Sequence, residues 1–347
     1  MIGVLDRERG DWLSSGVAGG LLVLLLVGGL VTYKSSSALQ QIDRARIGGA
    51  IATRADVVPV GSAPSLSVMA RSANYLAVIW QAFAFGLLIS AAVRAFIPAA
   101  ALARLFDGGS VRGQLVAGAA GAPLMLCSCC VTPIFSSVYR RSSRLGPSLA
   151  LLLAAPALNP AALVLTFLLF SGDVAWARLA MSLVAVFAGT ALVARLAGHR
   201  RADAPPLPVT AFDPPPEGGP VMRYLESLAH IGLRTVPLIV VGVIVSMSLS
   251  DYLPMWIQSP SAGVWVIVIA ASLALPLALP TFFEIPLAVA LLAAGAPAGA
   301  AAALLFAGPV VNLPSLLTVG QVAGWKATVL IASMVWLVAV AGGLAIG

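Results

Sequence analysis

The sequence predicts an all-α polytopic membrane protein, and three observations support this fold class: its composition, its apolar runs and an internal duplication. Hydrophobic residues make up 60% of the 347 positions and charged residues only 10%. Soluble domains have roughly 45–50% apolar and about 25% charged residues. Such a small share of charged side chains cannot cover the surface of a water-soluble protein. Most of the surface must therefore face lipid.

The apolar residues gather into nine runs, and their lengths are near the roughly 20 residues that a helix needs to cross a bilayer. Charges lie mostly in the short connectors between the runs. The first run resembles the apolar region of a signal peptide, but no small-residue cleavage site accompanies it. We therefore expect that this N-terminal helix is retained. The nine runs are 16–33, 75–97, 114–139, 146–170, 174–196, 227–250, 264–291, 300–320 and 327–346.

The formal charge of +7 does not indicate a nucleic-acid partner. The basic residues are scattered over the connectors without interleaved aromatic residues, and the positive-inside bias of membrane proteins explains them. The expected partners are therefore the lipid bilayer and a small-molecule substrate. A homo-oligomer is left open.

Two polar stretches divide the chain into four parts. Residues 34–74 form a mixed polar segment with a short amphipathic helix expected over 38–51, and residues 203–220 are too rich in proline to form a helix. We therefore expect an N-terminal membrane helix and polar loop over 1–74, a first repeat over 75–196, a linker over 197–226, and a second repeat over 227–347.

The duplication appears when residues 123–166 are shifted by 153 positions onto residues 276–319. Matches between alanine and leucine mean little in this composition, but five matches of proline, glycine and asparagine in one register indicate two related halves. The matched pairs are Pro123 with Pro276, Pro133 with Pro286, Gly146 with Gly299, Pro156 with Pro309, and Asn159 with Asn312.

Prolines frame two kinds of helix interruption in each half, at 123–133 and 156–160, and again at 276–286 and 309–314. Proline removes an amide donor and frees a carbonyl, and non-helical backbone at membrane depth is tolerated only inside protein or beside a water-filled cavity. Duplicated transporters place their substrate sites where such interrupted helices meet near the midplane. We expect that arrangement with inverted repeats, although the distribution of basic residues also allows parallel ones.

All three cysteines, Cys127, Cys129 and Cys130, lie in the first interruption. Thiols are soft ligands that select soft metals and metalloids, whereas a single buried cysteine commonly acts as a small apolar residue. The clustering favours contact with a substrate over packing alone. We assign Cys127, Ser128 and Cys129 to substrate binding.

Glu284 is the acidic residue within an apolar run, and it lies in the second interruption. An ionisable residue inside the membrane is costly and indicates a functional site. We expect Glu284 to contact substrate and to couple transport to an ion, with Arg234 as the basic residue clearly inside an apolar run and its candidate partner. Asn159 and Asn312 follow the other two breaks, where they can satisfy exposed backbone groups or face the substrate.

The motifs in these two blocks resemble a known family. Gly121-Ala-Pro-Leu-Met-Leu-Cys-Ser-Cys-Cys-Val-Thr-Pro133 and Ala155-Pro-Ala-Leu-Asn-Pro160, with Ala307-Gly-Pro-Val-Val-Asn312 in the second half, are similar to motifs of the predicted-permease family of YraQ-like proteins and ArsP organoarsenical efflux permeases. The resemblance implies a multi-pass permease of the bacterial inner membrane. In its best-known members it implies export of trivalent organoarsenicals through membrane cysteines, which Cys127 and Cys129 match. Cys130 stands where glycine is usual.

The sequence therefore favours a secondary transporter rather than an enzyme, with no cofactor and no bound metal of its own. The phosphate-binding pattern G-x-x-x-x-G-K-[ST] is missing from the sequence. Two alternatives stay open: a membrane thiol-disulfide oxidoreductase, and a channel or scaffold without a transport cycle. If Cys127 and Cys129 bind a soft metalloid, Cys127→Ser and Cys129→Ser should each abolish resistance, whereas Cys130→Gly should have little effect.

Overall fold

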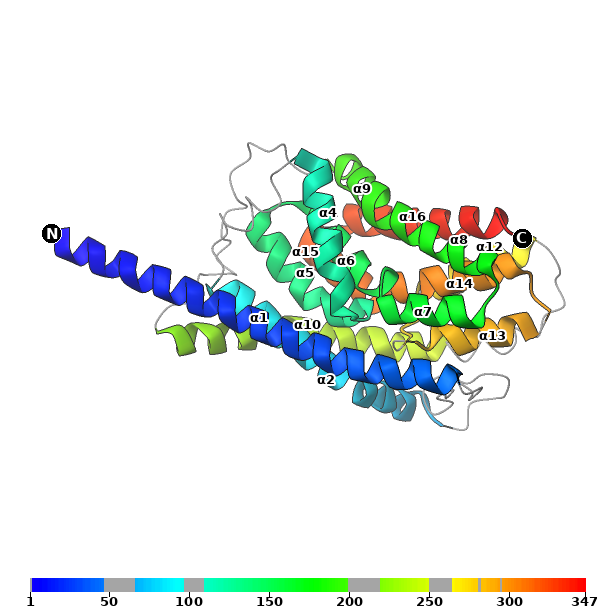
Figure 1. The fold of residues 1–347 in the computed structure, drawn as a ribbon, viewed down its shortest axis with the longest axis horizontal. Coiled ribbons are helices and arrows are strands. Elements are labelled where there is room, and N and C mark those ends of the chain that lie inside the picture. The colour runs from blue at the N-terminus through cyan, green and yellow to red at the C-terminus, as the bar shows by residue number, and fades with distance from the viewer. Residues whose placement is uncertain are drawn as a thin grey trace.

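The computed structural model describes residues 2–46, 66–96, 109–198, 219–249, 264–279, 282–293 and 295–347 (Figure 1). Within these ranges all regular structure is helical. The elements are α1 (Ile2–Arg46), α2 (Val68–Phe96), α4 (Gly109–Gly121), η1 (Ala122–Leu124), α5 (Ser128–Ser142), α6 (Leu145–Ala157), α7 (Pro160–Leu169), α8 (Gly172–Leu183), η2 (Val184–Gly189), α9 (Thr190–Leu196), α10 (Pro220–Leu249), α12 (Val264–Ala274), α13 (Glu284–Ala293), α14 (Ala298–Val310), α15 (Leu313–Ala323) and α16 (Trp325–Leu344).

The prediction of a multi-pass membrane protein is confirmed. Five helices in the described ranges are long and apolar enough to cross a membrane, or up to seven if each of two bent pairs counts as one span. Large apolar side chains also face outward, including Leu25 at 73%, Trp176 at 63% and Leu233 at 78% exposure. Water would oppose such a surface, whereas acyl chains solvate it.

The number of spans is lower than the number of runs in the sequence. Runs 114–139 and 264–291 do not form single spans, because each is divided between two shorter helices, α4 with α5 and α12 with α13. Run length alone cannot distinguish one long helix from two short ones joined by a turn.

Helices α6 and α14 form the centre of the molecule. Every residue of α6 is buried, and nearly every residue of α14. Both are apolar all round, as expected for helices surrounded by protein. Helix α6 packs against α4, α5 and α9, while α14 packs against α12, α13 and α16. Small residues allow the close approach: Gly299 of α14 meets the backbone of Gly343 in α16 so closely that a Cβ atom would clash.

The interruptions at 156–160 and 309–314 are confirmed as helix breaks. Helices α6 and α7 meet at 42°, and α14 and α15 meet at 48°. Each second helix begins at an asparagine cap with a proline in its first turn, where a missing amide donor costs nothing. Breaks of this kind release backbone groups inside the protein rather than toward lipid.

The interruptions at 123–133 and 276–286 are confirmed as well. In the first, α4 and η1 end before a non-helical stretch, and α5 begins at Ser128. In the second, α12 ends at Ala274 and α13 begins at Glu284. Pro133 and Pro286 lie inside the new helices, so each break occupies the earlier part of its proline-framed segment.

Helix α1 is longer than the sequence suggested, since it continues from Ile2 to Arg46. The short helix expected over 38–51 is the end of α1 as far as Arg46. Figure 1 shows α1 lying along one side of the body, where it packs on α2 and α7. Residues 47–65 of the predicted polar loop and 199–218 of the proline-rich linker lie outside the described residues. The described parts of that loop are largely helical, because 34–46 end α1 and 68–74 begin α2.

Candidate functional site

The break before α5 brings the three cysteines together. Met125 has a left-handed backbone (φ 50°) at the end of η1, and Cys127 is extended (φ −69°, ψ 161°) as the N-cap of α5. The Cys127 sulfur lies 3.1 Å from that of Cys129 and 2.7 Å from that of Cys130. The sulfurs of Cys129 and Cys130 are 3.9 Å apart. In a regular helix, Cys127 and Cys129 would point in nearly opposite directions. The broken backbone is therefore what allows their sulfurs to meet.

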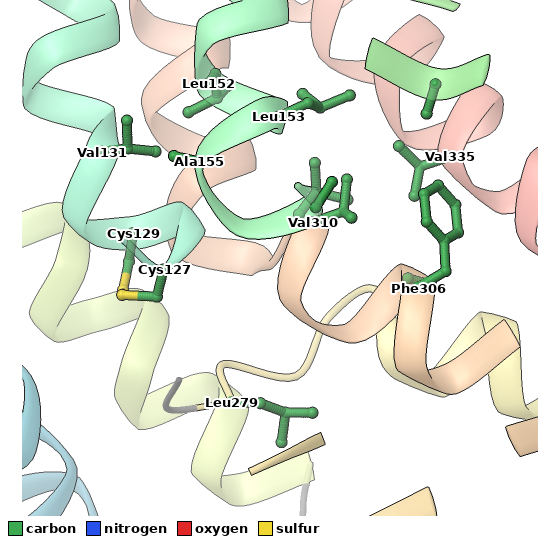
Figure 2. Packing of buried hydrophobic residues seen from close by; sticks show 14 of the residues in the cluster. Cys127, Cys129, Val131, Leu152, Leu153, Ala155, Leu279, Phe306, Val310 and Val335 are labelled. Atoms are coloured by element: carbon green, nitrogen blue, oxygen red, sulfur yellow. The ribbon is translucent and has the colours of Figure 1, made fainter. Parts of the chain in front are cut away.

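The cysteine cluster, defined here as Cys127, Cys129 and Cys130, is buried in the core. Figure 2 shows Cys127 and Cys129 side by side at the start of α5. The hydroxyl oxygen of the fully buried Tyr75, on α2, lies 3.5 Å from the Cys129 sulfur. Lys34 of α1 lies within electrostatic reach of Cys127. The cluster is therefore enclosed by α1, α2 and α5.

Ser128 lies within the same turn and is fully buried. Its hydroxyl oxygen has no hydrogen-bond partner among the residues that the structure describes. A buried hydroxyl without a partner is unfavourable. Ser128 thus brings an unused polar atom to the break that holds the cysteines.

The cysteine cluster brings three soft ligand atoms within reach of one ion. In the described ranges it is the group of cysteine, histidine and acidic residues close enough to hold an ion, with ligand atoms within 4.8 Å of one another. Sulfur atoms bound to one ion at about 2.3 Å lie at most roughly 4 Å apart. The three sulfurs already satisfy that limit, and thiolates prefer soft metals and metalloids.

The second break holds a buried ion pair. Glu284 is the first residue of α13, and its Oε1 accepts a hydrogen bond of 3.1 Å from Nη2 of Arg178 on α8. The two side chains are 2% and 1% exposed. Burying either charge alone is strongly unfavourable, so each residue requires the other. The pair joins α8 in the first half of the chain to α13 in the second.

Arg178 also holds the start of α7. It donates hydrogen bonds to the hydroxyl of Thr166 and to the carbonyl of Ala162. The Ala162 amide is in turn capped by the Asn159 side chain at 3.3 Å. Glu284 keeps one oxygen, Oε2, without a hydrogen-bond partner in the part of the chain that the structure describes. The network therefore links the α6–α7 break to the α12–α13 break and leaves one acceptor unused.

Sequence reasoning missed Arg178. The expected partner of Glu284 was Arg234, which lies in α10, and the Arg234 side chain is outside the described residues. Its coupling role stays a prediction, but Glu284 already has a cation. The statement that Arg234 is the basic residue inside an apolar run was wrong, because Arg178 lies within the run 174–196. An acidic side chain buried in an apolar run requires a cation nearby. A basic residue within another apolar run was therefore the signal that could have pointed to Arg178.

The two asparagines act as helix caps. Asn159 accepts hydrogen bonds from the amides of Ala161 and Ala162, and Asn312 forms a reciprocal capping box with Ser315. Both are buried. These contacts account for the backbone groups that the breaks expose, while substrate contact by either asparagine stays a prediction.

Comparison with known proteins agrees with the motifs. The chain is similar to UPF0718 protein YraQ of Escherichia coli (strain K12), with 29% identity over 310 residues, which cover 86% of this chain and 85% of that relative. It is also similar to UPF0718 protein MJ0584 of Methanocaldococcus jannaschii, with 23% identity over 273 residues, which cover 60% and 74%. No solved structure matches it. The family model described as predicted permease, ArsP_1, matches residues 66–347. The chain therefore belongs to this predicted permease family.

Proposed function

We propose that this chain is a secondary transporter of the bacterial inner membrane that moves a small thiophilic substrate, such as a trivalent organoarsenical. The observation that carries the proposal is the cysteine cluster: three buried sulfurs within 3.9 Å of one another at a helix break, in a chain of a permease family. Cys127 and Cys129 bind the substrate by this proposal, and Ser128 offers its free hydroxyl beside them.

The proposed transport path lies between two related repeats. Helix boundaries support this duplication, because adding 153 to 145–157, the bounds of α6, gives 298–310, the bounds of α14. The same addition turns 160–169 of α7 into 313–322, against 313–323 for α15. It turns 68–96 of α2 into 221–249, against 220–249 for α10.

Packing between the halves supports a pseudo-two-fold relation. Gly189 packs against Met334, and Gly342 packs against Met181. These two contacts are equivalent, because 189 + 153 = 342 and 181 + 153 = 334. When the same patch of each copy contacts the other reciprocally, the copies are related by a two-fold rotation. Both inverted and parallel repeats have such an axis, and we propose inverted ones, with the breaks meeting near the midplane.

The Arg178–Glu284 pair is the proposed coupling element. It connects the two halves across a buried contact, so a motion that separates them must break it or protonate the carboxylate. The unused Oε2 of Glu284 offers an acceptor for a proton or a cation during that motion. Alternating access by rocking of one repeat against the other requires such a switchable contact.

A resistance and transport panel tests the proposed function. Cells without their own arsenical exporters, expressing this chain, are expected to survive higher concentrations of trivalent methyl- and phenylarsenicals and to accumulate less arsenic. Cys127→Ser and Cys129→Ser should each remove the effect at equal protein abundance. Wild-type resistance and arsenic content equal to the empty-vector control for every arsenical would reject this substrate class.

The thiol-disulfide oxidoreductase alternative has one observation in its favour, the 2.7 Å separation of the Cys127 and Cys130 sulfurs at a helix start. Purified protein separates the two functions. An oxidoreductase would exchange disulfides with a thiol reagent in repeated turnovers, and it would do so without any substrate crossing the membrane. Transport into sealed vesicles without such turnover supports the permease.

A further inference from the structure

The position of Cys130 changes what the cysteine cluster can bind. From the sequence alone, Cys130→Gly is expected to have little effect. In the structure, however, the Cys130 sulfur is nearer to Cys127 than the Cys129 sulfur is, at 2.7 Å against 3.1 Å. Cys130 is also fully buried in the core. Three sulfurs, rather than two, therefore surround one point.

We propose that the cysteine cluster is a three-thiol site for an inorganic trivalent metalloid, arsenite or antimonite, and that Cys130 is its third ligand. The inference rests on the proposed function and narrows its substrate class. A trivalent metalloid with three replaceable hydroxyls uses all three sulfurs, whereas an organoarsenical with one carbon substituent uses only two. Cys130 thereby shifts the preference of the site toward the inorganic species.

The chemistry needs no oxidant or reductant. One As(OH)₃ reacts with three thiols to form three arsenic–sulfur bonds, and each thiol proton leaves with a hydroxyl group as water. Phenylarsine oxide, hydrated to its dihydroxy form, reacts with two thiols, forms two such bonds and releases two waters. Arsenic remains trivalent in both reactions, and the protein thiols are neither oxidised nor reduced.

Charge favours a metalloid over a divalent metal at this depth. The arsenic tris-thiolate is neutral, so it can lie among buried apolar residues without an uncompensated charge. A divalent metal held by three thiolates carries one negative charge, which Lys34 could offset only from a half-buried position. Structural zinc also takes four ligands, and the ion-binding group found in the described residues has three.

Purified full-length protein in detergent provides the test, with arsenite and phenylarsine oxide as probes. X-ray absorption at the arsenic edge counts sulfur neighbours, and calorimetry gives the affinity. Arsenite should show three sulfurs in the wild type and two in Cys130→Ala, where its affinity falls by about tenfold or more. Phenylarsine oxide should show two sulfurs in both proteins, with affinities within about threefold of each other.

Controls keep the outcomes distinct. Cys130→Ser repeats the loss with a hydroxyl in place of the sulfur, and thermal unfolding verifies that both variants remain folded. Arsenite bound through two sulfurs in the wild type, equal arsenite affinity in Cys130→Ala, or stronger binding of Zn²⁺ than of arsenite would each overturn the three-thiol site. Phenylarsine oxide bound through Cys127 and Cys129 would then still support the proposed function. Failure of both probes to bind rejects both proposals.

Discussion

The breaks at 123–133 and 276–286 occupy corresponding places in the two halves but carry different chemistry. The first presents three soft sulfur ligands and a serine hydroxyl at the start of α5. The second presents Glu284 at the start of α13, paired with Arg178 from the other half. The same kind of helix break therefore holds two different sets of side chains. By the duplication and the function proposed above, one repeat binds the ligand and the other supplies a contact between the repeats.

The largest effect is expected at the first break. Cys127→Ser and Cys129→Ser should abolish arsenical resistance, because the hydroxyl oxygen is a hard ligand and binds a soft metalloid poorly. Each change nearly conserves volume but buries a hydroxyl, so the free energy of unfolding should fall by about 1–3 kcal/mol. Resistance assays with quantified membrane protein measure the effect. Full resistance in both serine variants would mean that the cysteine cluster only packs in the core and binds no arsenical.

The next largest effect is expected at the second break. Arg178→Ala leaves Glu284 buried without its cation, which should lower the free energy of unfolding by about 3–5 kcal/mol. Thermal or denaturant unfolding in detergent measures the loss. The double variant Arg178→Met with Glu284→Leu should recover most of the stability but not transport. A single variant as stable as the wild type would show that the pair does not hold the halves together.

A smaller effect is expected from Glu284→Gln. The amide still accepts the hydrogen bond from Arg178 but no longer neutralises its charge, so the expected loss is about 1–3 kcal/mol. If Glu284 carries the coupling proton, uptake into vesicles should lose its dependence on pH. Uptake that follows the wild-type pH profile would leave Glu284 a structural role only.

The smallest effects are expected at the asparagine caps. Asn159→Ala and Asn312→Ala should each cost about 1 kcal/mol. Asn159→Ala should cost slightly more, because the Asn159 side chain accepts hydrogen bonds from two backbone amides, whereas the Asn312 side chain accepts one, from Ser315. Unfolding measurements on both variants compare the two halves directly. Equal losses would mean that the second amide bond at Asn159 adds nothing, and Asn159→Ser and Asn312→Ser should each retain most of the stability.

The sequence predicted the helical breaks, because proline and asparagine act on the local backbone and their effects are visible in a short window. It also located the cysteine cluster. It did not predict the Arg178–Glu284 pair, which joins residues 106 positions apart and depends on how the halves pack. Arg178 lies in the first turns of the run 174–196, five residues after Asp173. Cys127 and Cys130 are three residues apart, and in a helix this spacing places two side chains on one face. The sequence could therefore also have suggested that Cys130 lies beside Cys127.

The Arg178–Glu284 pair also bears on how the chain is made. Ribosomes add about 5–20 residues per second, so Arg178 waits roughly 5–20 s for a partner that is 106 residues away. An arginine at the centre of a lipid-exposed helix costs about 2.5–3.5 kcal/mol in membrane insertion, and Arg178, which lies nearer the start of the span Gly172–Leu196, costs at most that much. Thr166 and the Ala162 carbonyl, both made earlier, can hold its guanidinium during that interval. The first half of the chain therefore enters the membrane before its buried arginine has an acidic partner. The ion pair forms only after the second half supplies Glu284.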